Sequence, residues 1–277
     1  MSTHNIEMKR TKVGVVQMTS TDAIEANLRT AERLTEQAAD EGASLVVLPE
    51  CFAYLGPEAG KLAIAEALPQ GGPILARFAE LARRRGIELV LGGFWEKGES
   101  AAKVRNACVH LDREGAVRAV YRKIHLFDVD LPDGTVLKES ATVEPGTEVV
   151  VTDACLGKLG LTVCYDVRFP ELYRRLVDRG AIALAIPAAF TLTTGKDHWH
   201  VLLRARAIES QSYVLAAAQT GRHHGDRRSY GHALICDPWG TVLAECGEGE
   251  GVAVAWVDPE VVRRVRASLP SLAHRVL

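Results

Sequence analysis

The sequence lacks an apolar run long enough to cross a bilayer. Its longest such run, residues 181–190, contains Pro187, whereas a membrane-spanning helix needs about 20 apolar residues. The N-terminal stretch, residues 1–12, is polar and lacks the apolar segment of a secretory signal. We therefore expect a cytoplasmic protein that does not contact membranes.

Blocks of one charge and clusters with metal-ligand spacing are also missing. The 33 basic and 35 acidic residues are spread along the 277-residue chain, so we expect no nucleic-acid partner. The cysteines form no C-x-x-C pair and no zinc-like spacing with histidine, so we expect no metal and no organic cofactor. In a cytoplasmic chain most of them should be reduced and buried. The six cysteines are Cys51, Cys108, Cys155, Cys164, Cys236 and Cys246.

Strand and helix patterns alternate along most of the chain. A hairpin in the first half indicates that the strands are not all parallel. The pattern predicts one α/β domain with enough strands for two mixed sheets. Strands are expected at residues 13–18, 45–48, 87–91, 104–111, 117–122, 159–164, 182–186 and 213–218, then in a C-terminal meander. Helices are expected at residues 24–34, 73–85, 170–178 and 197–210.

Three polar residues stand where predicted strands end: Glu50, Lys123 and Cys164. Open α/β sheets bind ligands at the carboxyl ends of their strands. A thiol becomes a strong nucleophile when a neighbour takes its proton, and Glu50 could do so in a site dry enough to raise its pKa. Lys123 and the backbone N–H of Tyr165 would stabilise the oxyanion. This chemistry suits attack on an amide or a related carbon.

Each of these residues also has an ordinary structural interpretation. A single cysteine is more often an inert core thiol, and Cys51 and Cys236 also lie near strand ends. A glutamate after a strand is often a helix cap, and a lysine is usually a surface charge. A catalytically silent binding protein is therefore an open alternative.

The segments around the three residues resemble motifs of the carbon–nitrogen hydrolase (nitrilase-like) superfamily. Leu48-Pro49-Glu50 resembles its glutamate motif, residues 121–128 its lysine motif and residues 160–171 its nucleophile motif, in the same order. The resemblance extends over residues 11–269, which we expect to form one carbon–nitrogen hydrolase domain. It implies a four-layer αββα sandwich, no metal or cofactor, and a homodimer or a larger homo-oligomer.

The resemblance also implies a role for each matching residue. Glu50 is the expected base, Lys123 the cation that stabilises the oxyanion, and Cys164 the nucleophile. Glu139, in Lys138-Glu139-Ser140, matches a second glutamate that positions the lysine and the substrate. True nitrilases typically carry Cys-Trp-Glu where this chain has Cys-Tyr-Asp from Cys164, so an amidase is favoured.

Later segments resemble the Nit-type amidases, namely residues 187–191, 194–195, 198–199, 202–209, 229–232 and 237–240, and residues 217–224 bear on the choice within that branch. Within that branch the resemblance favours cleavage of deaminated glutathione to 2-oxoglutarate and Cys-Gly. Hydrolysis of 2-oxoglutaramate by an omega-amidase and hydrolysis of N-carbamoyl amides are the alternatives.

Both 2-oxo substrates carry a carboxylate that Arg168 could bind with two hydrogen bonds, unless an intramolecular salt bridge occupies it. Thr194 could add a hydroxyl, and Tyr165, Phe190 and Tyr54 are the other expected binding residues. The chain departs from its relatives at His200, where glutamate is usual, and at Lys196-Asp197, where Pro-Ala is commoner. These departures affect how a substrate would fit at the mouth of the pocket.

Overall fold

Alternate side chains of the central strands face two different hydrophobic cores. In β1 (Thr11–Met18), Val13 and Val15 lie in the core between two sheets, whereas Val16 and Met18 lie in the core under the first helices. β2 (Leu45–Leu48) alternates in the same way. Side chains of successive strand residues point to opposite faces, so a strand that is apolar throughout can be covered on both sides.

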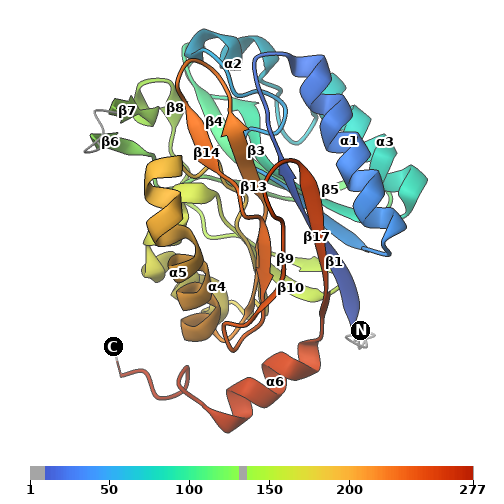
Figure 1. The fold of residues 1–277 in the computed structure, drawn as a ribbon, viewed down its shortest axis with the longest axis vertical. Helices are drawn as coiled ribbons and strands as arrows, with labels where there is room; N and C mark the ends of the chain where they lie inside the picture. Colours follow the sequence, from blue (N-terminus) through green and yellow to red (C-terminus); the bar gives the residue numbers. More distant parts are fainter. Residues whose placement is uncertain (1–9, 131–135, 277) are drawn as a thin grey trace.

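The computed structural model describes residues 10–130 and 136–276 (Figure 1). Residues 1–9, most of the polar N-terminal stretch, lie outside this part. Nine of the described strands form the first sheet, with the path β14-β13-β1-β2-β3-β4-β5, β17 beside β1 and β8 beside β4. The remaining strands of this sheet are β3 (Glu88–Lys97), β4 (Val104–Leu111), β5 (Val117–Arg122), β8 (Val143–Glu144), β13 (Ala218–Arg222), β14 (Arg228–Tyr230) and β17 (Gly251–Val257).

Six described strands form the second sheet, in the order β16-β15-β12-β11-β10-β9. Its strands are β9 (Val151–Ala154), β10 (Gly157–Leu161), β11 (Ala183–Ala185), β12 (Tyr213–Ala216), β15 (Leu234–Cys236) and β16 (Val242–Glu245). A further pair, β6 (Asp128–Asp130) and β7 (Val136–Lys138), forms a small ribbon.

Helices cover the outer face of each sheet. In Figure 1, α1 (Ile24–Asp40) and α3 (Pro73–Arg85) lie on one side of the strands, and α4 (Pro170–Asp178) and α5 (Leu192–Ser210) lie on the other. The predicted α/β fold with αββα layers and mixed sheets is therefore confirmed. The shorter helices are α2 (Glu58–Ile64), η1 (Glu139–Ala141), η2 (Cys164–Arg168) and α6 (Pro259–Ser268). Among the described helices, none is both long and apolar enough to cross a membrane.

The run at residues 213–218, predicted as one strand, is divided between the two sheets. β12 ends at Ala216 in the second sheet and β13 begins at Ala218 in the first, so Ala217 alone joins them. The chain then returns to the second sheet for β15 and β16, and β17 pairs with β1. This crossing fixes the two sheets to each other.

Candidate active site

The ends of several strands bring Glu50, Lys123 and Cys164 together. Glu50 follows β2, Lys123 follows β5, and Cys164 comes three residues after β10. The middle of β3 packs tightly against the glutamate: a Cβ at Gly93, whose φ is +58°, would lie 2.6 Å from the Cα atom of Glu50. Glycine is therefore required where this strand passes the site.

Three donors surround the carboxylate of Glu50, which is 4% exposed. Its Oε1 accepts hydrogen bonds from Nζ of Lys123 (3.0 Å) and Nδ2 of Asn106 (2.9 Å). Its Oε2 accepts one from the backbone N–H of Ala189 (2.8 Å). A buried carboxylate with this many donors is held in one orientation.

Lys123 lies between two carboxylates. Its Nζ donates to Oε2 of Glu139 at 2.8 Å as well as to Glu50, and the lysine side chain is 2% exposed. Glu139 is itself oriented by the backbone N–H of Phe127, which donates to its Oε2 at 2.7 Å. Asn106 also donates to Glu139, so one amide group connects both acids. The ammonium group is thus fixed beside the base.

Cys164 begins η2 in a left-handed backbone conformation, with φ 48°. This conformation is uncommon for residues other than glycine and persists only where the surroundings impose it. Here the N–H of Cys164 donates to the carbonyl of Pro187 at 2.8 Å. Its thiol lies close enough to the Glu50 carboxylate and to Lys123 for both charges to act on it.

These neighbours set the protonation of the site. Burial alone would raise the pKa of Glu50, but the charge of Lys123 and the hydrogen bonds from Cys164, Lys123 and Ala189 outweigh it, and the pKa is lowered. The prediction of a raised pKa for this glutamate is therefore wrong. Burial, reinforced by the Glu50 charge, raises the pKa of Cys164 well above its ordinary value. The resting pair is a carboxylate and a neutral thiol.

Asp166 joins the nucleophile segment to the lysine segment. Its Oδ2 accepts hydrogen bonds from the Tyr121 hydroxyl (2.7 Å) and from the backbone N–H of Val163 (2.8 Å). Its Oδ1 accepts from the backbone N–H of His125 (3.2 Å), and that histidine's Nδ1 lies 2.7 Å away. One fully buried carboxylate thus fixes the spacing between Cys164 and Lys123.

The comparisons with known proteins agree with this arrangement. Residues 12–267 match the carbon–nitrogen hydrolase family. The chain belongs to this family. It is 46% identical over 273 residues to deaminated glutathione amidase of Synechocystis sp., covering 97% of this chain and 99% of that protein. It is 47% identical over 270 residues to deaminated glutathione amidase of Homo sapiens, covering 95% and 81% respectively.

A solved structure leads to the same assignment. The C. elegans NitFhit protein superposes on this carbon–nitrogen hydrolase with a TM-score of 0.90 at 42% identity. The match covers 96% of this chain and 65% of that chain. The predicted superfamily and the predicted enzyme class, an amidase, are confirmed.

Two cavities in this carbon–nitrogen hydrolase meet at Cys164. The larger has a volume of about 200 Å³ and is lined by Glu50, Lys123, Glu139 and Cys164, among others. The smaller, about 10 Å³, is lined by Cys164 together with Tyr165, Arg168, Phe190 and Thr194. Of the predicted binding residues, Tyr54 alone is absent from the described lining of both cavities. Its hydroxyl donates to the carbonyl of Pro57 at 2.8 Å.

Arg168 is free of the salt bridge that was its alternative interpretation. Its guanidinium lies 5.1 Å from the centre of the Phe190 ring, and its Nη2 is 3.3 Å from Nδ1 of His198. Within residues 10–130 and 136–276 no acidic side chain pairs with it. The hydroxyls of Thr194 and Thr191 are 2.8 Å apart beside it.

Arg227 also lines the larger cavity, although its local sequence does not predict this position. His223 anchors its loop: Nδ1 of this histidine lies 2.8 Å from the carbonyl oxygen of Ser20, and Nε2 lies 2.8 Å from the Ser229 hydroxyl. The Arg227 side chain makes no hydrogen bond or ion pair in the described part of the chain. Glu58, in the same cavity, is already bonded to Lys61 and Thr142.

The other cysteines differ from Cys164 in their surroundings. Cys51 also lines the larger cavity, and burial and the Glu50 charge raise its pKa as they raise that of Cys164. Burial raises the pKa of Cys236 to about 12. Position at a strand end could not separate these thiols, whereas Cys164 is the one described cysteine that lines both cavities.

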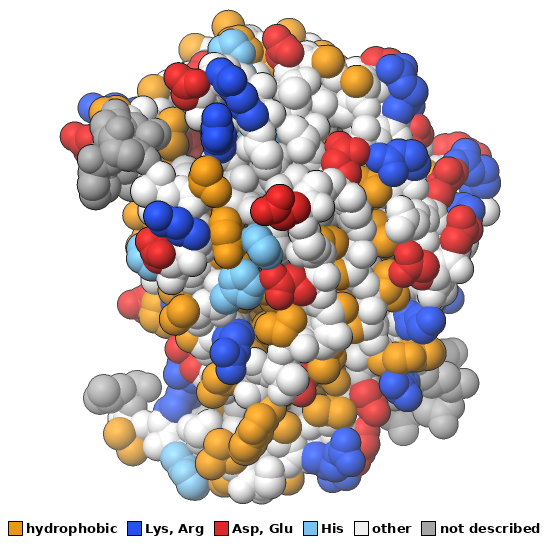
Figure 2. Space-filling view, viewed as in Figure 1, with side chains coloured by type: hydrophobic (Ala, Val, Ile, Leu, Met, Phe, Trp, Pro, Cys, Tyr) orange, Lys and Arg blue, Asp and Glu red, His pale blue; other side chains and the backbone are white. Residues whose placement is uncertain are grey.

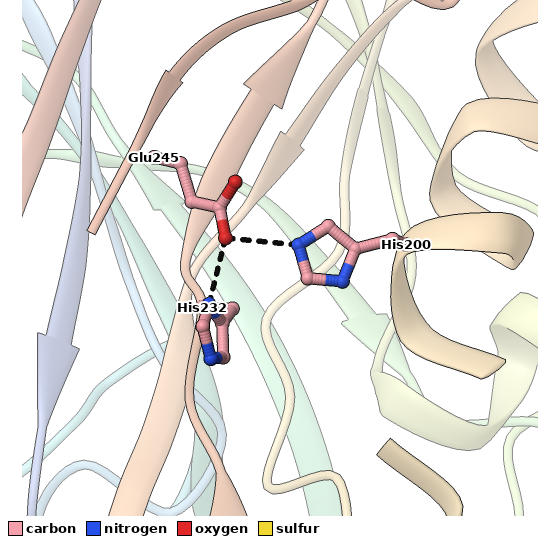
Figure 3. A group of neighbouring side chains, drawn as sticks. All are labelled: His200, His232 and Glu245. Carbon is pink, nitrogen blue, oxygen red and sulfur yellow. Dashed lines mark hydrogen bonds and ion pairs between the residues drawn. The ribbon is translucent and has the colours of Figure 1, made fainter. Parts of the chain in front are cut away.

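A candidate metal-binding group lies apart from these cavities. His200, His232 and Glu245 bring three possible ligand atoms within 4.8 Å of one another (Figure 3). None of the three residues lines either cavity that contains Cys164.

Proposed function

We propose that the protein hydrolyses deaminated glutathione to 2-oxoglutarate and Cys-Gly, with Cys164 as nucleophile, Glu50 as base and Lys123 as the oxyanion-stabilising cation. The observation that carries the chemistry is the position of the Cys164 thiol in one cavity with an ionised Glu50 and the fixed ammonium group of Lys123, whose charges both act on it. The substrate is supported by the two relatives that bear this name and by two arginines that line the cavities on either side of Cys164.

The proposed reaction has two steps. The Cys164 sulfur attacks the amide carbon while its proton passes to Glu50, and Glu50 then gives that proton to the departing nitrogen. The C–N bond breaks, Cys-Gly leaves, and a thioester remains. Water then attacks the thioester, Glu50 accepts its proton and returns it to the thiolate, and 2-oxoglutarate leaves.

Lys123 and Glu139 act during both steps of this scheme. The ammonium group of Lys123 and the backbone N–H of Tyr165 stabilise the negative oxygen of each tetrahedral intermediate. Glu139 holds Lys123 in position, since its Oε2 accepts a hydrogen bond from Nζ at 2.8 Å. These roles are the ones implied by the resemblance, and the observed contacts support them.

Arg168 and Thr194 are proposed to bind the 2-oxo carboxylate of the acyl group. Both line the smaller cavity with Cys164, and Phe190 provides its apolar wall. At about 10 Å³ this cavity holds no more than a water molecule. Arg168 therefore has to swing away from the Phe190 ring when a carboxylate enters.

Arg227 is proposed to bind the carboxylate of the leaving group. A half-buried guanidinium that is unpaired in the described part of the chain, in the cavity beside the nucleophile, favours an anionic ligand. Cys-Gly ends in a carboxylate, whereas 2-oxoglutaramate releases ammonia. This difference favours deaminated glutathione over the omega-amidase substrate.

The test compares the two substrates in wild type and in two matched variants. We expect a higher kcat/KM for deaminated glutathione, and no turnover by Cys164→Ala. Arg227→Gln should lower kcat/KM about tenfold or more for deaminated glutathione alone, and Arg168→Gln should lower it for both substrates.

Each contrary outcome indicates a different error. Equal losses for both substrates in Arg227→Gln would show that Arg227 does not contact the leaving group. Wild-type preference for 2-oxoglutaramate would support the omega-amidase alternative. Activity on N-carbamoyl amides alone would support that alternative, and an unreactive Cys164 would indicate a binding protein.

A further inference from the structure

Three side chains from separate segments converge on the surface near α5. His200 lies on α5, His232 follows β14, and Glu245 ends β16 (Figure 3). Oε1 of Glu245 lies 2.9 Å from Nε2 of His200 and 2.7 Å from Nδ1 of His232. Figure 2 shows histidine and acidic side chains side by side near the middle of this face. Among the described residues, this is the one group with metal-ligand geometry.

We propose that these three residues bind a divalent transition-metal ion of the zinc class. Two imidazole nitrogens and one carboxylate oxygen form a ligand set that zinc prefers, with the fourth position left to water. Cations that prefer oxygen ligands, such as Mg²⁺ and Ca²⁺, are a poor match for two imidazoles. The site is separate from the hydrolytic residues, and it includes His200, one of the positions at which the chain departs from its relatives.

Binding of an ion requires the three ligand atoms to rearrange. A tetrahedral ion with bonds of 2.0–2.1 Å separates its ligand atoms by about 3.3–3.4 Å. The two separations that involve Glu245, 2.9 and 2.7 Å, are shorter by roughly half an ångström, and all three ligand atoms lie within 4.8 Å of one another. Glu245 is at the end of a strand and about one third exposed, so its side chain has room to move back by that amount.

The backbone directs His232 toward this point. It has a left-handed conformation, with φ 59°, and its carbonyl accepts a hydrogen bond from Nε1 of Trp199 at 2.9 Å. Its ring stacks on Tyr230, with 4.4 Å between ring centres. The His200 ring lies edge-on to the His232 ring, with 5.4 Å between ring centres. Both imidazoles are therefore oriented before any ion binds, which limits the entropy lost on binding.

An ion here would join α5 to the hairpin of β15 and β16. The same helix carries Thr194 near its first turn, and Gly195 lies against Tyr230, since a Cβ there would be 2.3 Å from the Tyr230 Cβ. The ion would therefore stabilise the wall of the smaller cavity. It would take no part in the bond-breaking steps.

Titration of the purified full-length chain with Zn²⁺ after chelation and dialysis tests this site. We expect one ion per chain by calorimetry and a higher Tm with Zn²⁺. Co²⁺ should give the ligand-field spectrum of nitrogen and oxygen ligands, without the intense thiolate charge-transfer band.

Variants separate this group from the six cysteines. His200→Gln, His232→Asn and Glu245→Gln should each weaken Zn²⁺ binding more than the roughly 10–100-fold that loss of an outer-sphere partner costs. Asparagine is chosen at His232 because it tolerates the left-handed conformation. His224→Gln, an exposed histidine outside the group, is the matched control and should bind normally.

Two results would overturn the proposal. The first is wild-type protein that binds neither Zn²⁺ nor Co²⁺ at millimolar concentration. The second is binding that persists in His200→Gln and Glu245→Gln, or that shows the thiolate band, because either would assign the ion to cysteines.

Discussion

At Cys164, burial and the neighbouring Glu50 carboxylate raise the thiol pKa, so the resting site holds no thiolate. A permanently ionised cysteine would react with many electrophiles. In the proposed mechanism the proton leaves when an acyl carbon approaches and Glu50 accepts it. Reactivity therefore depends on the substrate occupying the cavity.

Replacement of Cys164 tests the assignment of the nucleophile. Cys164→Ala should lower kcat by about 10⁴-fold or more, since loss of a nucleophile removes the covalent pathway. Cys155→Ser, in a partly buried turn away from the cavities, is the control and should keep full activity. Turnover in Cys164→Ala that disappears in Cys51→Ser would transfer the role to Cys51.

The pH profile tests the protonation of Glu50. Its pKa is lowered from 4.5, so the carboxylate is ionised above that pH and is lost as a base only below it. The kcat/KM profile should therefore stay level from about pH 7 to about pH 5 and fall at lower pH. Near-ultraviolet circular dichroism at each pH controls for unfolding. A loss of kcat/KM centred near pH 6 in folded protein would contradict a lowered pKa for Glu50.

The sequence could locate Glu50, Lys123 and Cys164 because each follows a recognisable apolar strand. It could not predict that the pKa of Glu50 is lowered, because the carboxylate accepts hydrogen bonds from Asn106 and Ala189, which are distant in the chain. Arg227 was missed for a similar reason. An arginine in a polar loop has the same local pattern whether it faces solvent or a cavity.

At the scale of elements, Asp166 makes η2 and the segment after β5 a single unit. Four hydrogen-bond contacts, two to each carboxylate oxygen, connect Tyr121, His125 and Val163 through it. Backbone hydrogen bonds also hold each segment, from Cys164 to Pro187 and from Lys123 to Asn106. Asp166 adds the direct side-chain connection between the two segments.

Asp166→Asn tests that connection. The amide replaces one acceptor oxygen with a donor, so the buried groups that donate to that oxygen lose their acceptor. The free energy of unfolding should therefore fall by about 1–3 kcal/mol. kcat should fall as Lys123 and Cys164 lose their fixed spacing. Urea unfolding and steady-state kinetics measure the two effects. Asp153→Asn, an exposed residue of β9, is the control; equal effects in both variants would contradict the argument.

Helices and strands with a clear hydrophobic periodicity could be predicted well from the sequence. The bounds of α3, α4, β4 and β5 agree with the predicted ranges. The division of residues 213–218 at Ala217 could not be predicted, because the run is uniformly apolar and contains no glycine or proline. α5 begins at Leu192, five residues before the predicted Asp197, since threonines and Gly195 resemble a loop in sequence.

At the scale of the whole molecule, large apolar side chains are exposed along α5 and the β15–β16 hairpin. Val201 is 67% exposed, Trp239 61% and Ile208 49%. Gly240 of the hairpin turn lies against Ile208, so these side chains belong to one face. Contiguous exposed apolar surface often marks a protein interface. The face supports the prediction of a homodimer.

Light scattering with size exclusion tests the oligomeric state. We expect a mass of about 60 kDa for the wild type, twice the 30.1 kDa chain, because the apolar face would be buried between two copies. Val201→Lys should shift the mass toward one chain. Leu62→Lys, on α2, should not. A monomeric wild type at tens of micromolar would contradict the prediction.

The second half of the chain supplies strands to both sheets, and this affects the protein while it is being made. β1 pairs with β13 and β17, which leave the ribosome long after Glu50 and Lys123. The first sheet therefore cannot be completed by the early part of the nascent chain. The strands that carry Glu50 and Lys123 at their ends thus wait for late-made partners before their sheet is complete.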